Sequence, residues 1–203
     1  MTRRALLASI VLSFAAACSR HGESGFVDPE PAPEVHGLAV VRGTPFDLRA
    51  ERGKVVVLSF GYTSCAEICP ETFSTMKSVL RDLGPASSEL LFAYVTVDPE
   101  RDRPEVLKAF IESVDPRFEG VFAEGDALAS VLSGYHVTVR KRLPDPSRYA
   151  KRDVDPSAFY SMDHTAGFWG IDRRGRLRFK LTHDATPASV TEATRRLVEE
   201  EDR

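Results

Sequence analysis

Two cysteines separated by three residues are the part of this sequence best suited to chemistry. Cys65 and Cys69 flank Ala66, Glu67 and Ile68, which leave enough slack for the two sulfur atoms to converge. Converging thiols can form a local disulfide, act as a redox dithiol, or bind one soft metal ion as thiolates. The spacing alone does not choose among these three chemistries.

The cysteines lie where a buried strand is expected to meet a helix. Residues 55–60 form a nearly continuous apolar run, which is typical of a strand covered on both faces. Pro70 favours the start of a helix, and apolar residues then repeat at helical spacing until Gly84 and Pro85. Cys69 is therefore expected near a helix N-terminus, where the helix dipole favours a thiolate and makes it a better nucleophile and metal ligand.

The rest of the pattern predicts an α/β domain. A second buried strand is expected at residues 90–97, closed by Asp98 and Pro99 and followed by a helix from Pro104. A right-handed crossover brings the ends of both strands together, so Asp98 is expected near the cysteine loop, either as a turn former or as a metal contact. We further expect a hairpin at 37–48, a short helix at 126–132, strands at 135–139, 167–172 and 176–182, a closing helix at 187–198, and an insertion without apolar periodicity at 141–157.

The N-terminal residues are typical of an export signal. Arg3 and Arg4 precede an apolar run that ends at residue 17 and is too short to span a bilayer as a stable helix. Cys18 follows three alanines, as in a bacterial lipobox, and is expected to carry a lipid anchor; the alternative is ordinary cleavage nearby, which leaves a spare thiol. Residues 18–35, rich in Gly, Ser, Pro and Glu, are expected to form a flexible tether before a single domain at 36–203.

Cysteine count and charge narrow the class of protein. The chain has 3 cysteines in 203 residues, too few for a disulfide-stapled scaffold. It holds 27 basic and 30 acidic residues, so the loss of Arg3 and Arg4 with the signal changes the net charge from −3 to −5 and argues against a nucleic-acid partner. The basic run Arg140 to Arg142 is either a solvated loop or a docking patch for an acidic partner.

Three segments resemble a known family in the order in which they occur. FGYTSCAEICPETFSTM, VTVDPERDRPEVLKAF and MDHTAGFWGIDRRGRL resemble the signatures of the Sco/SenC family of copper-handling proteins. Ala66 and Glu67 stand where that family usually has proline and aspartate. The resemblance covers residues 37–198. It implies a thioredoxin-like fold, a central mixed sheet flanked by helices, with an insertion before the metal-binding histidine.

The resemblance also implies a ligand set. His164, in the sequence Asp163-His164-Thr165, matches the family's metal-binding histidine, so it is expected to join Cys65 and Cys69 around one ion. Two thiolates and one imidazole form a soft set that suits Cu(I) and can take Cu(II) with an added ligand. Among the 5 histidines, His183 is the alternative to His164. Asp163 is expected to orient a ligand, and Asp98 is a further candidate at the site.

The function implied is that of a membrane-tethered copper metallochaperone of the cell envelope. Its domain would lie on the extracytoplasmic side and deliver copper to the binuclear copper site of a cytochrome c oxidase subunit. Other periplasmic copper chaperones and thioredoxin-like reductants are further expected partners.

Two other functions stay open. In a thiol–disulfide oxidoreductase, Cys65 and Cys69 would be the catalytic redox pair. In a copper or redox sensor, they would signal to a partner protein. The three-residue spacing, and the absence of the Trp-Cys-Gly-Pro sequence of thioredoxins, favour a metal site over disulfide exchange.

Overall fold

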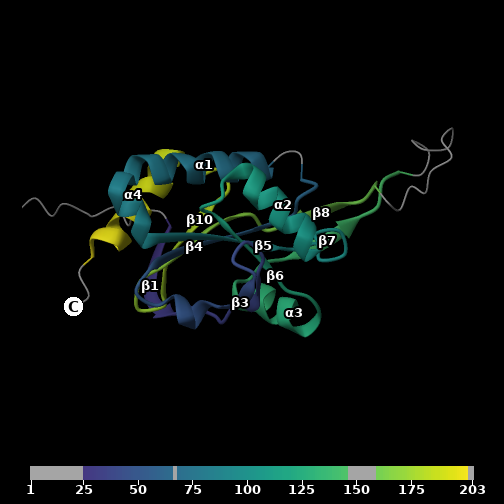
Figure 1. The fold of residues 1–203 in the computed structure, drawn as a ribbon, viewed down its shortest axis with the longest axis horizontal. Helices are drawn as coiled ribbons and strands as arrows, with labels where there is room; N and C mark the ends of the chain where they lie inside the picture. Colours follow the sequence, from purple (N-terminus) through teal and green to yellow (C-terminus); the bar gives the residue numbers. More distant parts are fainter. Residues whose placement is uncertain (1–24, 66–67, 146–158, 201–203) are drawn as a thin grey trace, which may run out of the picture.

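A mixed eight-stranded sheet forms the centre of the molecule. The structure, a computed structural model, describes residues 25–65, 68–145 and 159–200, without the side chains of residues 68 and 69. The sheet has the strand order β1-β10-β9-β4-β5-β6-β2-β3, and helices cover both of its faces (Figure 1). The expected α/β fold with a mixed sheet is confirmed.

The central strand β4, Val55–Gly61, is buried along its whole length. It pairs in parallel with β5, Leu90–Thr96, and antiparallel with β9, Gly167–Ile171. Its side chains alternate between two cores: Val55 and Val57 lie in one, and Val56 and Leu58 lie in the other. This period of two explains why the strand reads as a continuous apolar run rather than as an alternating one.

In the described part of the chain, three α-helices cover one face of the sheet and one covers the other. The first core joins β4 to apolar side chains of α1, Ile68–Leu83, α2, Pro104–Val114, and α4, Pro187–Glu199. The second core includes side chains of α3, Gly125–Gly134. Helix α1 begins two residues before the expected Pro70, which makes Cys69 its second residue.

The remaining strands of the main sheet complete its two sides. On one side lie β6, Glu119–Phe122, and a hairpin of β2, His36–Ala39, and β3, Thr44–Asp47, as expected from the sequence. On the other side, β10, Arg176–Thr182, pairs with β9. A short 3₁₀ turn at Leu48–Glu51 connects β3 to β4, and another at Gly84–Glu89 connects α1 to β5.

The expected tether differs from the structure over part of its length. Residues 18–24 lie outside the described residues, but β1, Phe26–Pro31, pairs with β10 at the edge of the main sheet. The ring centroids of Phe26 and Phe179 lie 6.0 Å apart. The guanidinium carbon of Arg196 lies 4.3 Å from the ring centroid of Phe26. Pro29 and Pro31 are tolerated because β1 is an edge strand. The prediction of a flexible tether is therefore wrong for these residues, since a proline-rich composition is compatible with an edge strand as well as with a linker.

A two-stranded ribbon stands apart from the main sheet. It consists of β7, Val139–Arg142, and β8, Ser161–His164, and lies beyond α2 on the side of the molecule away from β1 (Figure 1). The prediction of a strand at 135–139 is wrong for residues 135–138, and β7 begins only at Val139. Residues 135–138 form a turn in which the Val137 amide donates to the carbonyl of Leu132 in α3, and His136 has a φ of 55°. Most of the insertion expected at 141–157 lies outside the described residues, which omit 146–158.

Candidate metal centre

The cysteine loop, residues 62–67, connects β4 to α1, and its described part, residues 62–65, is a tight turn. After β4 ends at Gly61, the amide of Cys65 donates to the carbonyl of Tyr62 over 3.2 Å. Cys65 is partly buried and packs against both cores. The side chain of Cys69 lies outside the described residues, so the convergence of the two sulfur atoms stays a prediction.

His164 lies beside this loop although about one hundred residues separate the two in sequence. Its ring meets that of Tyr62 edge to face, with centroids 6.0 Å apart and planes at 83°. The Nδ1 atom of His164 lies 3.1 Å from the carbonyl oxygen of Thr165. A carbonyl can only accept, so this contact favours the proton on Nδ1 and leaves the Nε2 lone pair for a metal ion. The alternative, His183, is exposed beyond the end of β10.

The two aspartates suggested by the sequence have other partners. Asp98 is 1% exposed, and its carboxylate accepts from the hydroxyl of Tyr160 over 2.7 Å and from Nε of Arg101 over 2.5 Å. Asp163 is exposed and its carboxylate binds Arg142 across the ribbon. Because neighbouring residues of a strand point to opposite faces, Asp163 and His164 are directed apart. The orienting role expected for Asp163 therefore has no contact to support it among the described residues.

A buried aspartate that is not among the predicted site residues anchors the cysteine loop. Asp102 is fully buried, and its carboxylate accepts from the amide of Thr63 over 2.9 Å and from the hydroxyl of Thr63 over 2.6 Å. The hydroxyl of Thr96, the last residue of β5, donates to it over 2.7 Å. Burial raises the pKa of Asp102, and these hydrogen bonds oppose that effect only in part. Its position in the second family signature is the one sequence signal that marks it.

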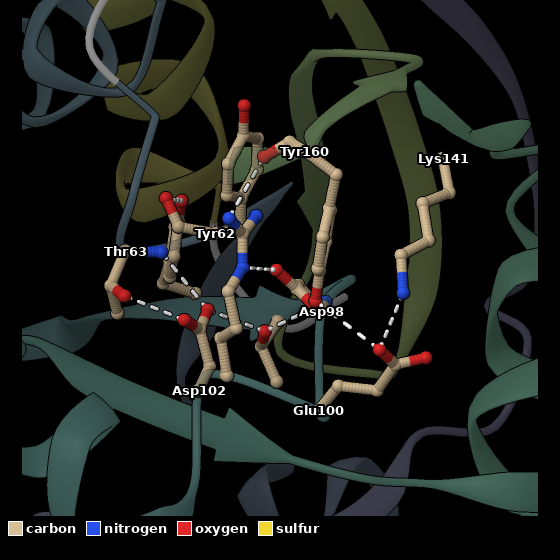
Figure 2. Close-up of polar contacts among 10 residues, drawn as sticks. Tyr62, Thr63, Asp98, Glu100, Asp102, Lys141 and Tyr160 are labelled. Carbon is tan, nitrogen blue, oxygen red and sulfur yellow. Dashed lines mark hydrogen bonds and ion pairs between the residues drawn. The ribbon is translucent and has the colours of Figure 1, made fainter. Parts of the chain in front are cut away.

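Arg101 contacts both the ribbon and the cysteine loop. Its Nη1 donates to the carbonyl of Tyr160 over 2.8 Å, and its guanidinium carbon lies 3.7 Å from the centroid of the Tyr160 ring. The same carbon lies 5.4 Å from the ring centroid of Tyr62. Figure 2 shows Tyr62, Thr63, Asp98, Asp102 and Tyr160 gathered in this polar network.

A more exposed ion pair, between Lys141 and Glu100, joins the ribbon to the turn at residues 98–102. Nζ of Lys141 lies 2.6 Å from the carboxylate of Glu100 and 3.8 Å from the ring centroid of Tyr160 (Figure 2). The hydrogen bond from Lys141 lowers the pKa of Glu100. Burial, and then the hydrogen bond to Asp98, raise the pKa of Tyr160, which therefore stays a neutral donor.

Comparison with known proteins assigns the chain to a family. The family model described as SCO1/SenC matches residues 35–199. The chain belongs to the SCO1/SenC family. The match includes the cysteine loop, the turn at 98–102 and the ribbon that carries His164, so all three family signatures lie on elements that meet in the structure.

Relatives and solved structures agree with this assignment. The "SCO2-like protein" of Rickettsia felis is 27% identical over 150 residues, which are 74% of this chain and 69% of that protein. The solution structure of apo Sco1 from Thermus thermophilus has a TM-score of 0.71 and 26% identity, and covers 86% of this chain and 95% of that one. The structure of Bradyrhizobium japonicum ScoI with copper bound has a TM-score of 0.65 and 29% identity, and covers 84% of this chain and 99% of that one. The fold is that of Sco thioredoxin-like proteins.

The described residues of this SCO1/SenC protein contain neither a complete metal site nor a membrane-spanning helix. No group of three His, Cys, Asp or Glu side chains able to hold a metal ion occurs among them, a set that does not include the Cys69 side chain. No helix in the described part of the chain is long and apolar enough to cross a membrane. The described donors of the site are thus the sulfur of Cys65, whose amide binds the carbonyl of Tyr62, and the imidazole of His164, whose ring meets that of Tyr62, with the second sulfur expected from the first turn of α1.

Proposed function

We propose that Cys65, Cys69 and His164 together bind one copper ion, which the protein carries as cargo. The observation that supports this most directly is the position of the His164 ring against Tyr62, three residues before Cys65. A thiolate pair and a neutral imidazole are the ligands that Cu(I) prefers. The Bradyrhizobium relative, solved with copper bound, supports the same choice of metal.

The chemistry of loading follows from the ligands. Both thiols must lose their protons to bind the metal, so copper affinity should rise with pH. The pair must also be reduced, because a disulfide between Cys65 and Cys69 offers no thiolate. Release would proceed by ligand exchange, with cysteines of the recipient replacing these sulfur atoms one at a time. The recipient that the family resemblance implies is the binuclear copper site of a cytochrome c oxidase subunit.

The N-terminal residues would place this site at a membrane. In the proposal, residues 1–17 are removed as a lipoprotein signal and Cys18 carries the lipid, so that the domain lies on the extracytoplasmic side of the cell envelope. Full-length protein expressed in bacteria should then partition with membranes, and Cys18→Ser should move it to the soluble fraction of the envelope. Membrane partitioning that Cys18→Ser leaves unchanged would contradict the anchor but not the copper site.

A titration of reduced protein with Cu(I) against a competing chelator tests the copper site. Cys65→Ser and Cys69→Ser should each abolish tight binding, and His164→Ala should weaken it at least about tenfold, because ligand loss costs no less than loss of an outer partner. The matched control is His183→Ala, an exposed histidine near the end of β10, which should bind copper like the wild type.

The same variants separate copper binding from disulfide exchange. Exchange needs both sulfur atoms but not the imidazole, so an oxidoreductase would lose activity with either cysteine variant and keep it with His164→Ala. Unchanged copper affinity in His164→Ala would contradict the proposed ligand set.

A further inference from the structure

We infer that Arg101 is a positioning residue that holds the His164 ribbon against the cysteine loop. The inference deepens the proposed copper site and rests on it for its functional meaning. Arg101 is not itself a ligand. Its proposed role is to set the distance between the imidazole and the sulfur atoms before any metal binds.

The ribbon needs such a contact because its strands do not pair with the main sheet. β7 and β8 hydrogen-bond to each other, and the order of the main sheet excludes both. Among the described contacts between this part of the chain and the rest of the domain, the hydrogen bond of Arg101 to Tyr160 is partly buried, whereas the bond of Lys141 to Glu100 is exposed. The guanidinium donates to the backbone carbonyl of Tyr160, one residue before β8, so it holds the main chain of the ribbon rather than a mobile side-chain tip.

Arg101 also keeps two aromatic rings in place. Its guanidinium carbon lies 3.7 Å from the ring centroid of Tyr160 and 5.4 Å from that of Tyr62. Such contacts are favourable when the cation is partly desolvated, and the Arg101 side chain is 24% exposed. The Tyr62 ring in turn meets the His164 ring. A chain of contacts therefore leads from Arg101 through Tyr62 to the imidazole.

An ion pair with Asp98 holds the guanidinium of Arg101 in position. Nε lies 2.5 Å from the carboxylate of Asp98, whose side chain is 2% exposed. Removal of Arg101 would leave that carboxylate with the hydroxyl of Tyr160 as its remaining side-chain donor among the described residues, and a buried carboxylate without its cation is strongly unfavourable. The ion pair thus fixes the guanidinium, and the guanidinium fixes the ribbon.

One turn holds both halves of the site. Asp102 follows Arg101 directly and binds Thr63 of the cysteine loop through two hydrogen bonds. The segment from Asp98 to Asp102 therefore contacts Thr63 of the cysteine loop through Asp102 (Figure 2), and it contacts the carbonyl of Tyr160, next to the ribbon, through Arg101. The copper ligands come from distant parts of the chain, but their supports are neighbours in sequence.

The experiment compares Arg101→Ala with Arg178→Ala in the intact domain. Arg178 is a matched control because its side chain is 13% exposed and binds two carboxylates, those of Asp172 and Glu200, away from the site. In metal-free protein, nuclear Overhauser contacts between the rings of Tyr62 and His164 should be present in the wild type and in Arg178→Ala, and lost in Arg101→Ala.

The second part of the experiment measures the Cu(I) affinity of the same variants. Arg101→Ala should lower Cu(I) affinity about tenfold, and Arg178→Ala should leave it unchanged at temperatures where both variants are folded. Because Arg101 acts through His164, the double variant Arg101→Ala/His164→Ala should bind no more weakly than His164→Ala alone, whereas independent effects would add. Arg101→Lys, which keeps the charge but not the forked donors, should recover part of the affinity and serves if Arg101→Ala does not fold.

Three results would overturn the inference: retained ring contacts in Arg101→Ala, wild-type affinity in that variant while His164→Ala binds copper more weakly, or additive losses in the double variant. The arms also separate this inference from the proposed function. If wild type and His164→Ala bound copper equally well, the ligand set would be wrong, but loss of the ring contacts in metal-free Arg101→Ala would still establish the positioning contact.

Discussion

Buried aspartates lie at both ends of the central sheet, and two of them, Asp172 and Asp102, are stabilised in opposite ways. Asp172, which follows β9 at the end where β4 begins, binds two arginines, with Arg176 at 2.8 Å and Arg178 at 3.1 Å. Asp102, beyond the end of β5, is bound by the hydroxyls of Thr63 and Thr96 and by an amide. Cations neutralise the first carboxylate, and neutral donors support the second.

The pKa values reflect this difference. Burial alone would raise the pKa of Asp172, but hydrogen bonds from Arg176 and Arg178 outweigh burial and lower it. The pKa of Asp102 is raised, because burial outweighs its hydrogen bonds. The Asp172 end therefore contributes to stability, whereas the Asp102 end holds a costly group in place to fix a loop. Such a cost is common at functional sites.

The largest effect should come from the Asp172 end. Asp172→Ala leaves two arginines without their shared buried carboxylate, and we expect a loss of about 3–5 kcal/mol in the free energy of unfolding, measured by urea denaturation. Copper affinity of the folded protein should not change. Reduced affinity in folded Asp172→Ala would break the comparison, since it would connect this end to the metal centre.

Asp102→Ala should lower the free energy of unfolding less than Asp172→Ala does, but it should weaken Cu(I) binding more. It removes the acceptor of three hydrogen bonds and also the cost of a buried carboxyl, so we expect a loss of about 2 kcal/mol in a urea titration. Because Thr63 belongs to the cysteine loop, Cu(I) affinity should fall about tenfold. Asp102→Asn keeps the shape and part of the hydrogen bonding and is the control. Wild-type copper affinity in Asp102→Ala would show that the loop needs no anchor.

The two carboxyls should also change the acid stability curve in opposite directions. A lowered pKa contributes stability above the ordinary value of 3.8 that is lost as pH falls through the folded value, so Asp172→Asn should flatten this acid loss. A raised pKa makes stability decrease as pH rises from 3.8 to the folded value, so Asp102→Asn should make stability rise more steeply there. Unfolding free energies between about pH 3 and 6 test both signs. Parallel curves for the two variants would contradict the comparison.

The smallest effect is expected from the exposed pair at the ribbon. The side chains of Lys141 and Glu100 are 40% and 67% exposed, and water screens such pairs strongly. Lys141→Gln should leave both the urea midpoint and the Cu(I) affinity within experimental error. A loss as large as that of Arg101→Ala would show that the charge of Lys141, rather than the buried guanidinium, holds the ribbon.

Local patterns in the sequence predict the elements that have a strong period of their own. The buried run of β4, the amphipathic spacing of α1 and the proline at the start of α2 lead to the mixed sheet and its helices. The family resemblance adds His164. β1 could not be found in this way, because its pairing with β10 depends on a partner about 150 residues away and its prolines are typical of linkers.

Local sequence patterns also do not predict the contacts through which Arg101 and Asp102 hold the site together. Arg101 and Asp102 lie in an ordinary charged stretch, and nothing in their spacing shows that one turns toward Tyr160 and the other toward Thr63. These are side-chain contacts between segments 39 or more residues apart, fixed only when the sheet is formed. The aspartates that the sequence did suggest, Asp98 and Asp163, instead form ion pairs with Arg101 and Arg142.

X-ray absorption spectroscopy of the Cu(I)-loaded domain, with His164→Ala measured in parallel, tests the copper site most directly. In our account the wild type has two sulfur neighbours and one nitrogen neighbour around copper, and His164→Ala loses the nitrogen while both sulfur neighbours remain. Identical spectra for the two proteins, with sulfur ligands alone, would show that the imidazole beside Tyr62 does not bind the metal.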